Sequence, residues 1–492
     1  MFRPASHNIS MSLYDAVSAA AEKIWGIYTV IPVLVCGLLL SARFGFPQLR
    51  VRSWMRETIG STMRKALCGT RKNGAEKGIS PFQTATAALA GTIGIGNIVG
   101  VAAALSVGGP SSIFWMCAAA VVMMGISYAE NRLGVIWRGA DGSGGTLGGP
   151  MLYMERGLGM KGLALFWAGI CALAAFGVGN ITQVNSISAA AESAFGCPAW
   201  LSGVIVALFT APAVLNGVSG AVKLTEKLVP LMAAAYILAC TAVIAVNIGR
   251  VPEALCRIFE GVLRPRAVAG GALGGMLVGV RRGVFTNEAG MGSSVMMNAA
   301  ADTGDAHAQG CWGIFEVFFD TIVICTLTAL ALLTSGAYDA EHDLGGVEMN
   351  TAAFECVFGS RAGAFVTICL VLFAFSTVIC WGATGERAMS YLCRGENKGY
   401  IQWYKYLYIA MIPIGAVMNV RTVWAAADII NACLLIPNLA AVMALTLGMR
   451  KSGDRSCCDR LMRPGRLAIG ESGGEAKGAK RGAAHRPGVP PL

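Results

Sequence analysis

Long apolar runs dominate this chain of 492 residues and limit what it can fold into. A helix that crosses a bilayer needs about 20 apolar residues. Runs of this kind lie near residues 24 to 42, 83 to 107, 113 to 137, 163 to 190, 200 to 218, 227 to 248, 267 to 300, 312 to 335, 361 to 385, 402 to 419 and 424 to 448. Since hydrocarbon offers the backbone no hydrogen-bond partners, such runs form helices. The sequence therefore predicts an all-α polytopic membrane protein with 11 spans.

The composition excludes most other classes of protein. Hydrophobic residues make up 55% of the chain and charged residues 14%, whereas soluble domains carry about 25% charged residues. The net charge of +11 comes from segments between the runs and from the tail, so it does not form the basic face that nucleic acid requires. The 16 Cys and four His show no metal-ligand spacing. We expect no enzyme, no cofactor, no nucleic-acid partner and no obligatory protein partner.

Positively charged residues predict the orientation in the membrane, because loops rich in Lys and Arg stay in the cytoplasm. The segment 43 to 80 holds nine such residues, and the tail at 449 to 492 holds ten. We expect an extracellular segment at 1 to 23, an extra leading helix at 24 to 42, a cytoplasmic basic loop, and a disordered, basic cytoplasmic tail. Four Arg between 249 and 266 are an exception on the outer side. The expected location is the bacterial cytoplasmic (inner) membrane.

Two of the runs contain sequences that disfavour a continuous helix. In the run at 83 to 107, four glycines fall within ten residues at mid-bilayer depth, namely Gly91, Gly94, Gly96 and Gly100. Each Gly in a helix costs about 1 kcal/mol relative to Ala and permits backbone angles that other residues resist. The run at 267 to 300 is longer than one crossing requires and is interrupted between Phe285 and Ser293. We predict an unwound segment in both runs.

Unwound backbone inside a membrane points to a binding site. It persists only where protein, ligand or water satisfies its polar groups. Freed carbonyls suit a cation or an ammonium group, and the N–H groups that open the next half-helix suit a carboxylate, so the two breaks together suit a zwitterion. Ten runs follow the leading helix and form repeats at 83 to 248 and 267 to 448, each opened by a broken span. This is typical of a 5+5 inverted-repeat secondary transporter. Glycines also serve close helix packing, and this alternative stays open for either cluster alone.

Short motifs along the chain carry a family resemblance. They are Gly45 to Arg50, Gly94 to Asn97, Tyr128 to Glu130, Gly148 to Met151, Gly179 and Asn180 with Gln183, Thr286 to Gly290, Phe319 to Thr321, and Ser376 and Thr377 with Trp381. At these positions residues 20 to 448 resemble the alanine or glycine:cation symporter family, sodium-coupled carriers of the amino-acid, polyamine and organocation group. The resemblance implies a leucine-transporter-like fold with an extra N-terminal helix. It also implies sodium-driven symport of a small neutral amino acid, such as alanine or glycine, by alternating access.

The same resemblance implies a sodium site. Its ligands would be the carbonyl oxygens of Ala90, Ile93 and Phe373 and the hydroxyls of Ser376 and Thr377. A hard cation takes such oxygen ligands. Serine and threonine in membrane helices also bond to carbonyls of their own helix, and this alternative stays open from residue type alone.

The substrate site is expected at the two breaks. Its residues would be Gly94, Gly96, Asn97, Gln183, Phe285, Thr286 and Trp381. The N–H groups of Gly94 and Gly96 would face the carboxylate, and carbonyls near Phe285 would receive the ammonium group. Gln183 would bond to the amino acid, although Gln also joins helices to one another. The Phe285 and Trp381 rings would close the pocket, although aromatic residues also serve in packing.

The acidic residues Glu288, Glu316 and Asp320 lie within apolar runs. We expect a structural role for Glu288, either capping the second break or pairing with Arg281. Glu316 and Asp320 lie one turn apart and could form a proton site, although such pairs also contact water or Arg at an interface. They keep open an alternative function, a proton-coupled carrier of the same fold for another small amino acid.

Overall fold

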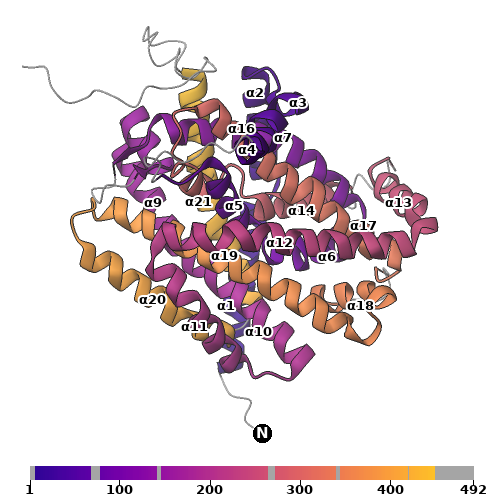
Figure 1. Cartoon of the computed structure of the whole chain (residues 1–492). Coiled ribbons are helices and arrows are strands. Elements are labelled where there is room, and N and C mark those ends of the chain that lie inside the picture. Colours follow the sequence, from indigo (N-terminus) through magenta and orange to yellow (C-terminus); the bar gives the residue numbers. More distant parts are fainter. Residues whose placement is uncertain are drawn as a thin grey trace, which may run out of the picture.

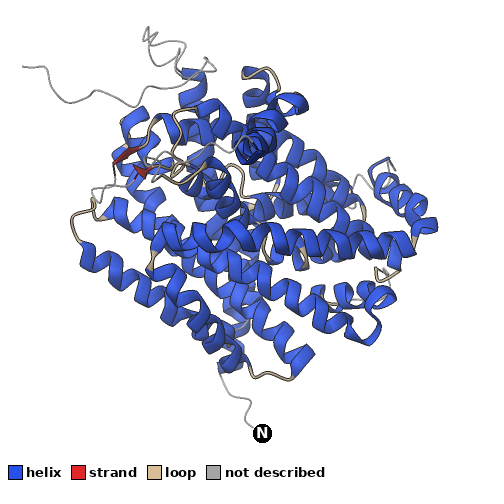
Figure 2. Cartoon of the chain, viewed as in Figure 1, coloured by secondary structure: helices blue, strands red, loops and turns tan. Residues whose placement is uncertain are grey.

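Helices form nearly all of the regular structure in the computed structural model (Figure 2). It describes residues 6–67, 78–140, 146–263, 272–338, 344–418 and 420–448. Within these ranges the strands are β1 (Gly139–Ala140) and β2 (Thr146–Leu147), which pair antiparallel. The tail at 449 to 492, expected to be disordered, lies outside the described residues.

Short 3-10 or π segments, labelled η, join or interrupt the α-helices. Up to residue 263 the helices are α1 (Ser6–Ile24), α2 (Ile27–Arg43), η1 (Pro47–Leu49), α3 (Val51–Met55), η2 (Arg56–Gly60), α4 (Ser61–Leu67), α5 (Pro81–Thr92), η3 (Ile95–Asn97), α6 (Val99–Gly108), α7 (Ser111–Ile136), α8 (Pro150–Leu152), η4 (Tyr153–Gly157), α9 (Lys161–Phe176), η5 (Gly177–Ile181), α10 (Thr182–Phe195), α11 (Ala199–Leu215), α12 (Gly217–Val246), η6 (Ile248–Arg250) and α13 (Val251–Leu263). From residue 272 they are α14 (Ala272–Asn287), α15 (Ser293–Asn298), α16 (Ala306–Val317), η8 (Phe318–Cys325), α17 (Thr326–Ser335), α18 (Gly346–Phe358), η9 (Gly359–Arg361), α19 (Ala362–Leu392), α20 (Lys398–Ala416) and α21 (Val420–Gly448).

Several helical segments have the length and composition of membrane spans. Within the described residues there are 7, namely Asp15–Arg43, Ser111–Ile136, Lys161–Phe195, Gly217–Val246, Ala306–Ser335, Gly346–Leu392 and Val423–Gly448. The other expected spans correspond to shorter helices: α5 with α6, α14 with α15, α11, and α20. The breaks explain why α5 with α6 and α14 with α15 are short, because each break divides one apolar run into two helices. The structure supports an all-helical membrane protein, and the count of 11 crossings stays a prediction.

The first span is longer than its apolar run. The helix α1 precedes the run and lies along α21, where Ala21 and the following Trp25 are buried. The Trp25 indole N–H donates to the carbonyl oxygen of Asp428 at 2.8 Å. Part of the segment expected outside the cell therefore continues the first helix. Figure 1 shows α2, α3 and α4 at the end of the bundle opposite to the N-terminus.

The broken helices lie in the interior of the bundle. The half-helix α5 contacts α12, α15 and α19, and α14 contacts α7 and α6. Close approach of α14 to α7 depends on glycine: a Cβ added at Gly275 would lie 2.6 Å from the Ser111 hydroxyl oxygen, and one at Gly279 would lie 3.0 Å from Trp115 Cβ. These two glycines therefore serve packing, as small residues commonly do in membrane helices.

Candidate functional site

The first predicted break lies between α5 and α6. The half-helix α5 begins with a capping box, in which the Ser80 hydroxyl accepts from the Gln83 N–H at 3.2 Å and Gln83 Oε1 accepts from the Ser80 N–H at 2.9 Å. It ends at Thr92, and Ile93 and Gly94 are extended before the short turn η3. The helix is unwound from Ile93 to Ile98, as the glycine pattern predicts.

Glycine is required in this break for space and not for backbone angle. Gly94 has a φ of −136°, which other residues also adopt. A Cβ at Gly94, however, would lie 2.7 Å from Thr377 Oγ1 and 3.1 Å from Gln183 Oε1, and one at Gly96 would lie 3.1 Å from Thr286 Oγ1. The glycines therefore allow polar side chains to approach the unwound backbone.

The second break lies between α14 and α15, at residues 288 to 292. Here backbone angle is decisive, because Gly290 and Gly292 have φ values of 88° and 82°. Glu288 also has a positive φ, of 54°, which costs a residue with a side chain roughly 1 to 2 kcal/mol. Its carboxylate accepts hydrogen bonds from the Ser293 hydroxyl and, at 3.0 Å, from the Trp381 indole. These bonds hold Glu288 in the strained conformation.

Five oxygen atoms predicted to bind sodium lie together between the end of α5 and the middle of α19. Thr377 Oγ1 lies 3.0 Å from the Ala90 carbonyl oxygen and 3.4 Å from that of Ile93. Ser376 Oγ lies 2.8 Å from the Phe373 carbonyl oxygen and 3.4 Å from that of Ala90. All five residues are buried. Around an ion with bonds near 2.4 Å, neighbouring octahedral oxygens are about 3.4 Å apart, so small shifts would admit a cation.

The two hydroxyls also bond within their own helix. Ser376 and Thr377 both donate to the Phe373 carbonyl, three and four residues earlier, at 2.8 and 3.1 Å. The alternative that residue type leaves open, bonding of the hydroxyls within their own helix, is therefore present together with the contact to α5. What distinguishes this place from ordinary back-bonding is the approach of Thr377 to the carbonyl of Ala90, in the last turn of α5, and to that of Ile93, in the unwound segment.

Gln183 reaches the first break. It follows the π segment η5, and its Oε1 accepts from the Ile95 N–H at 3.3 Å while its Nε2 donates to the Val178 carbonyl at 3.2 Å. The neighbouring Asn180 and Asn185 instead donate to backbone carbonyls of the α20 region. Of these three amides, Gln183 is the one beside the unwound backbone.

Asn97 joins protein groups and is not aimed at an open site. Its Oδ1 accepts from the Gly94 N–H at 3.0 Å, the group expected to face the substrate carboxylate. Its Nδ2 donates to Asp320 Oδ1 at 2.8 Å. In this structure Asn97 thus satisfies the freed N–H of Gly94 and connects it to the π segment η8.

A chain of hydrogen bonds through η8 links the two breaks. Asp320 Oδ2 accepts from the Thr321 hydroxyl at 2.9 Å, and Thr321 Oγ1 accepts from Asn287 Nδ2 at 3.1 Å. Asn287 Oδ1 accepts in turn from the Ala289 N–H, also at 3.1 Å. The link therefore runs from Gly94 to Ala289 through buried side chains.

Phe285 and Thr286 lie against the first break, because a Cβ added at Gly96 would lie 3.1 Å from Thr286 Oγ1 and 3.6 Å from Phe285 Cδ1. Phe285 stacks on Trp424 of α21, with ring centroids 5.0 Å apart, and Thr286 donates to the Arg282 carbonyl at 2.8 Å. Trp381 contacts Glu288 instead. It lines a small cavity of about 10 Å³ with Gly91 and other residues, roughly the space for one water molecule.

The acidic residues have other partners than those expected. Arg281 forms an ion pair with Asp428, so the hypothesis that it pairs with Glu288 is wrong. Glu316 is buried and accepts from Asn298 Nδ2 at 2.9 and 3.0 Å. Asp320 is fully buried as well, so neither carboxylate lies at an interface with water.

A further buried carboxylate at the second break was missed from sequence. Glu130 of α7 accepts from the Gly290 N–H at 3.2 Å and from Asn438 Nδ2 at 3.0 Å, and Asn438 also donates to the Gly290 carbonyl at 2.8 Å. An ionisable residue inside an apolar run is costly and commonly functional. That signal was available for Glu130 in the run at 113 to 137.

Comparisons with known proteins identify relatives along most of the chain. The model of the sodium:alanine symporter family matches residues 10–452. The sodium/alanine symporter AgcS of Methanococcus maripaludis is 37% identical over 443 residues, covering 89% of this chain and 95% of AgcS. The probable sodium/glutamine symporter GlnT of Bacillus subtilis is 35% identical over 435 residues, 88% of each chain.

A solved structure shares the fold. The crystal structure of MhsT in complex with L-phenylalanine matches with a TM-score of 0.54 and 15% sequence identity, covering 76% of this chain and 90% of that chain. At this identity the similarity concerns the fold. It supports the leucine-transporter-like architecture.

Proposed function

The chain belongs to the sodium:alanine symporter family, and from this premise we propose that it takes up a small neutral amino acid, such as alanine or glycine, together with sodium. The observation that carries the proposal is the set of five buried oxygens contributed by Ala90, Ile93, Phe373, Ser376 and Thr377. Sodium is the transported ion, and the set offers it uncharged oxygen ligands. The carbonyls among them include the C-terminal end of α5, where the helix dipole favours a cation.

Coupling follows because both solutes would bind at the same break, the end of α5 and the unwound segment after it. The ion would bind Ala90 and Ile93, and the amino acid would bind one to three residues further on, at Gly94 and Gly96 with Gln183 nearby. Ordering of this segment by the ion would lower the conformational cost of binding the amino acid. Linkage requires that the amino acid favours ion binding equally.

Substrate binding requires a rearrangement of Asn97. The Gly94 N–H donates a hydrogen bond to Asn97 Oδ1. A substrate carboxylate that accepts from this N–H would take the place of Asn97 Oδ1. The ammonium group would bind carbonyls near Phe285 and Thr286, beside the same segment. The site residues Gly94, Gly96, Asn97, Gln183, Phe285, Thr286 and Trp381 would surround a small side chain.

Alternating access is the proposed mechanism, with 11 spans arranged as an extra helix and a 5+5 inverted repeat. The N-terminus would lie outside and the C-terminus in the cytoplasm of the bacterial inner membrane. Two facts favour this arrangement: the broken helices are interior, and α2 brings the basic segment after Arg43 to the end of the bundle opposite to the N-terminus (Figure 1).

Uptake by the purified full chain in liposomes tests the proposal. We expect saturable uptake of labelled alanine or glycine under an inward sodium gradient, and little uptake under a proton gradient alone. A competition panel of serine, glutamine and D-alanine would define the substrate class. Uptake that follows the proton gradient and ignores sodium would overturn the proposed coupling.

A further inference from the structure

A second cavity, of about 430 Å³, lies away from the breaks. The end of α2 and the segment from η1 to η2 border it on one side, and α7 and α16 border it on the other. Its lining includes Arg43, Arg50, Arg56 and Arg132, together with Glu57. Positive charge therefore predominates in the lining.

Arg132 supplies a buried positive charge to this cavity. The residue is buried, with 3% of its surface exposed. Its Nη1 donates to the Tyr128 hydroxyl at 2.8 Å, and the guanidinium lies 5.5 and 5.3 Å from the centres of the Phe44 and Tyr128 rings. Its Nε and Nη2 have no hydrogen-bond partner among the described residues. Ring contacts offset only part of the cost of a buried cation.

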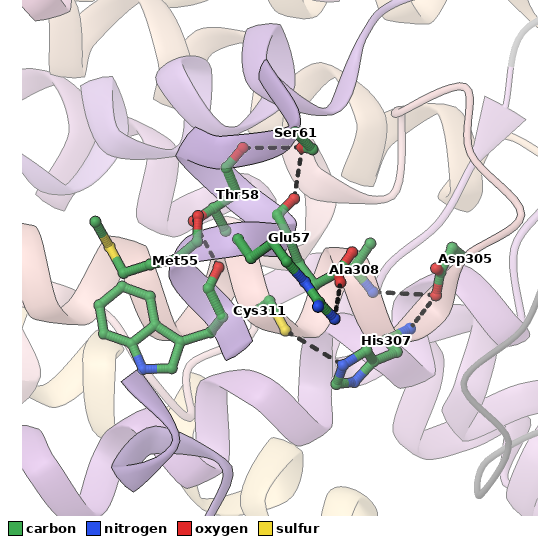
Figure 3. Close-up of polar contacts among 10 residues, drawn as sticks. Met55, Glu57, Thr58, Ser61, Asp305, His307, Ala308 and Cys311 are labelled. Atoms are coloured by element: carbon green, nitrogen blue, oxygen red, sulfur yellow. Dashed lines mark hydrogen bonds and ion pairs between the residues drawn. The ribbon is translucent and has the colours of Figure 1, made fainter. Parts of the chain in front are cut away.

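Nearby acidic residues already have other partners. Glu57 pairs with Arg56 at 3.4 Å. Asp305 accepts from the backbone N–H groups of His307 and Ala308, at 2.9 and 3.1 Å, at the start of α16 (Figure 3). The same view shows Cys311 directed at the His307 ring (Figure 3). Because the lining holds four arginines and one glutamate, an anion in the cavity would meet net positive charge, to which Arg132 and the exposed Arg50 contribute.

The surface next to the cavity is apolar. Exposed side chains on α2 include Ile31, Val35, Leu38 and Leu39, and beyond its end Phe46 and Leu49 are exposed as well. An apolar helix face that leads to a cluster of arginines suits a phospholipid, because acyl chains cover the first and the phosphate pairs with the second. We propose that this cavity binds the phosphate group of an anionic phospholipid, with its acyl chains along α2.

Binding would join the segment after α2 to α7 and α16, and so stabilise the folded protein. The test is the thermal unfolding of the purified full chain in neutral detergent, followed by tryptophan fluorescence. The probes are phosphatidylglycerol, phosphatidylcholine with the same acyl chains, and inorganic phosphate. We expect a saturable rise in Tm with phosphatidylglycerol and no comparable rise with the other two.

Three variants test whether the rise in Tm with phosphatidylglycerol arises from binding in this cavity. Arg50→Gln should weaken the apparent affinity for phosphatidylglycerol about tenfold, the scale of one charge-assisted hydrogen bond. Arg52→Gln is the matched control, because Arg52 is exposed in the same segment but does not line the cavity. Arg132→Gln should abolish the effect, and Arg50→Gln keeps the test valid if that buried variant fails to fold.

Three results would overturn the inference. Equal stabilisation by phosphatidylcholine, or an unchanged affinity in Arg50→Gln, would remove the arginine cavity as the binding site. A saturable rise with inorganic phosphate equal to that with phosphatidylglycerol would assign the cavity to a free anion and exclude the lipid.

Discussion

Thr377 Oγ1 lies 3.0 Å from the carbonyl oxygen of Ala90, although 287 positions separate the two residues. The contact joins the continuous helix α19 to the end of the half-helix α5. It exists because α5 stops at Thr92, which leaves nearby carbonyls without partners in their own helix. The proposed coupling depends on this junction.

Removal of both hydroxyls tests the ion site. In Ser376→Ala combined with Thr377→Ala, we expect the sodium concentration for half-maximal uptake to rise at least about tenfold, because two ligands are lost. Thr367→Ala is the control, since Thr367 of the same helix is buried and donates to the Ala190 carbonyl instead. An unchanged sodium dependence in the double variant would remove these residues from the site.

Crowding of the first break tests the role of Gly94. Gly94→Ala places a methyl group 2.7 Å from Thr377 Oγ1, so we expect uptake to fall by more than about tenfold through misplaced ligands. Gly169→Ala in α9 meets nothing within 4 Å and should leave uptake unchanged. Initial rates in liposomes, normalised to inserted protein, give the comparison. Equal rates in the two variants would refute the close-approach argument.

Asp320→Asn tests the link between the breaks. An amide in this place presents a donor to Asn97 or Thr321, both of which donate to the carboxylate. We expect about 1 to 3 kcal/mol less stability and a higher KM for the amino acid. Thr321→Ser retains the hydroxyl and should be close to the parent protein. Normal KM and stability in Asp320→Asn would show that the link has no positioning role.

Truncation of Trp381 tests its place beside the substrate. Trp381→Ala should let larger neutral amino acids compete for uptake, because the small cavity next to Glu288 would expand. The loss of packing should cost about 3 to 5 kcal/mol. Trp167→Ala, equally buried but bonded to the Leu434 carbonyl, should lower stability without altering selectivity. An unchanged competition profile in Trp381→Ala would contradict the proposed role.

The sequence predicts the family and the grouping of the proposed sodium ligands near the breaks better than it predicts which side chains contact one another. The family membership expected from motifs is confirmed by the family model and by the relatives. The five sodium ligands assigned by resemblance are brought together, and their function stays a prediction. Asn97, expected at the substrate, bonds to Asp320, and the Phe285 ring stacks on Trp424. Sequence patterns carry no distances between helices, so these partners were not predictable.

The sequence by itself determined the class of protein, its helices and the places where two of them unwind. These depend on apolar length and on local glycine content, which act within a few residues. Tertiary structure alone decided which groups meet, such as Arg281 with Asp428 and Glu130 with the Gly290 N–H. The physical reason is that a buried polar group must find its partner on whichever helix packs beside it, however distant that helix is along the chain.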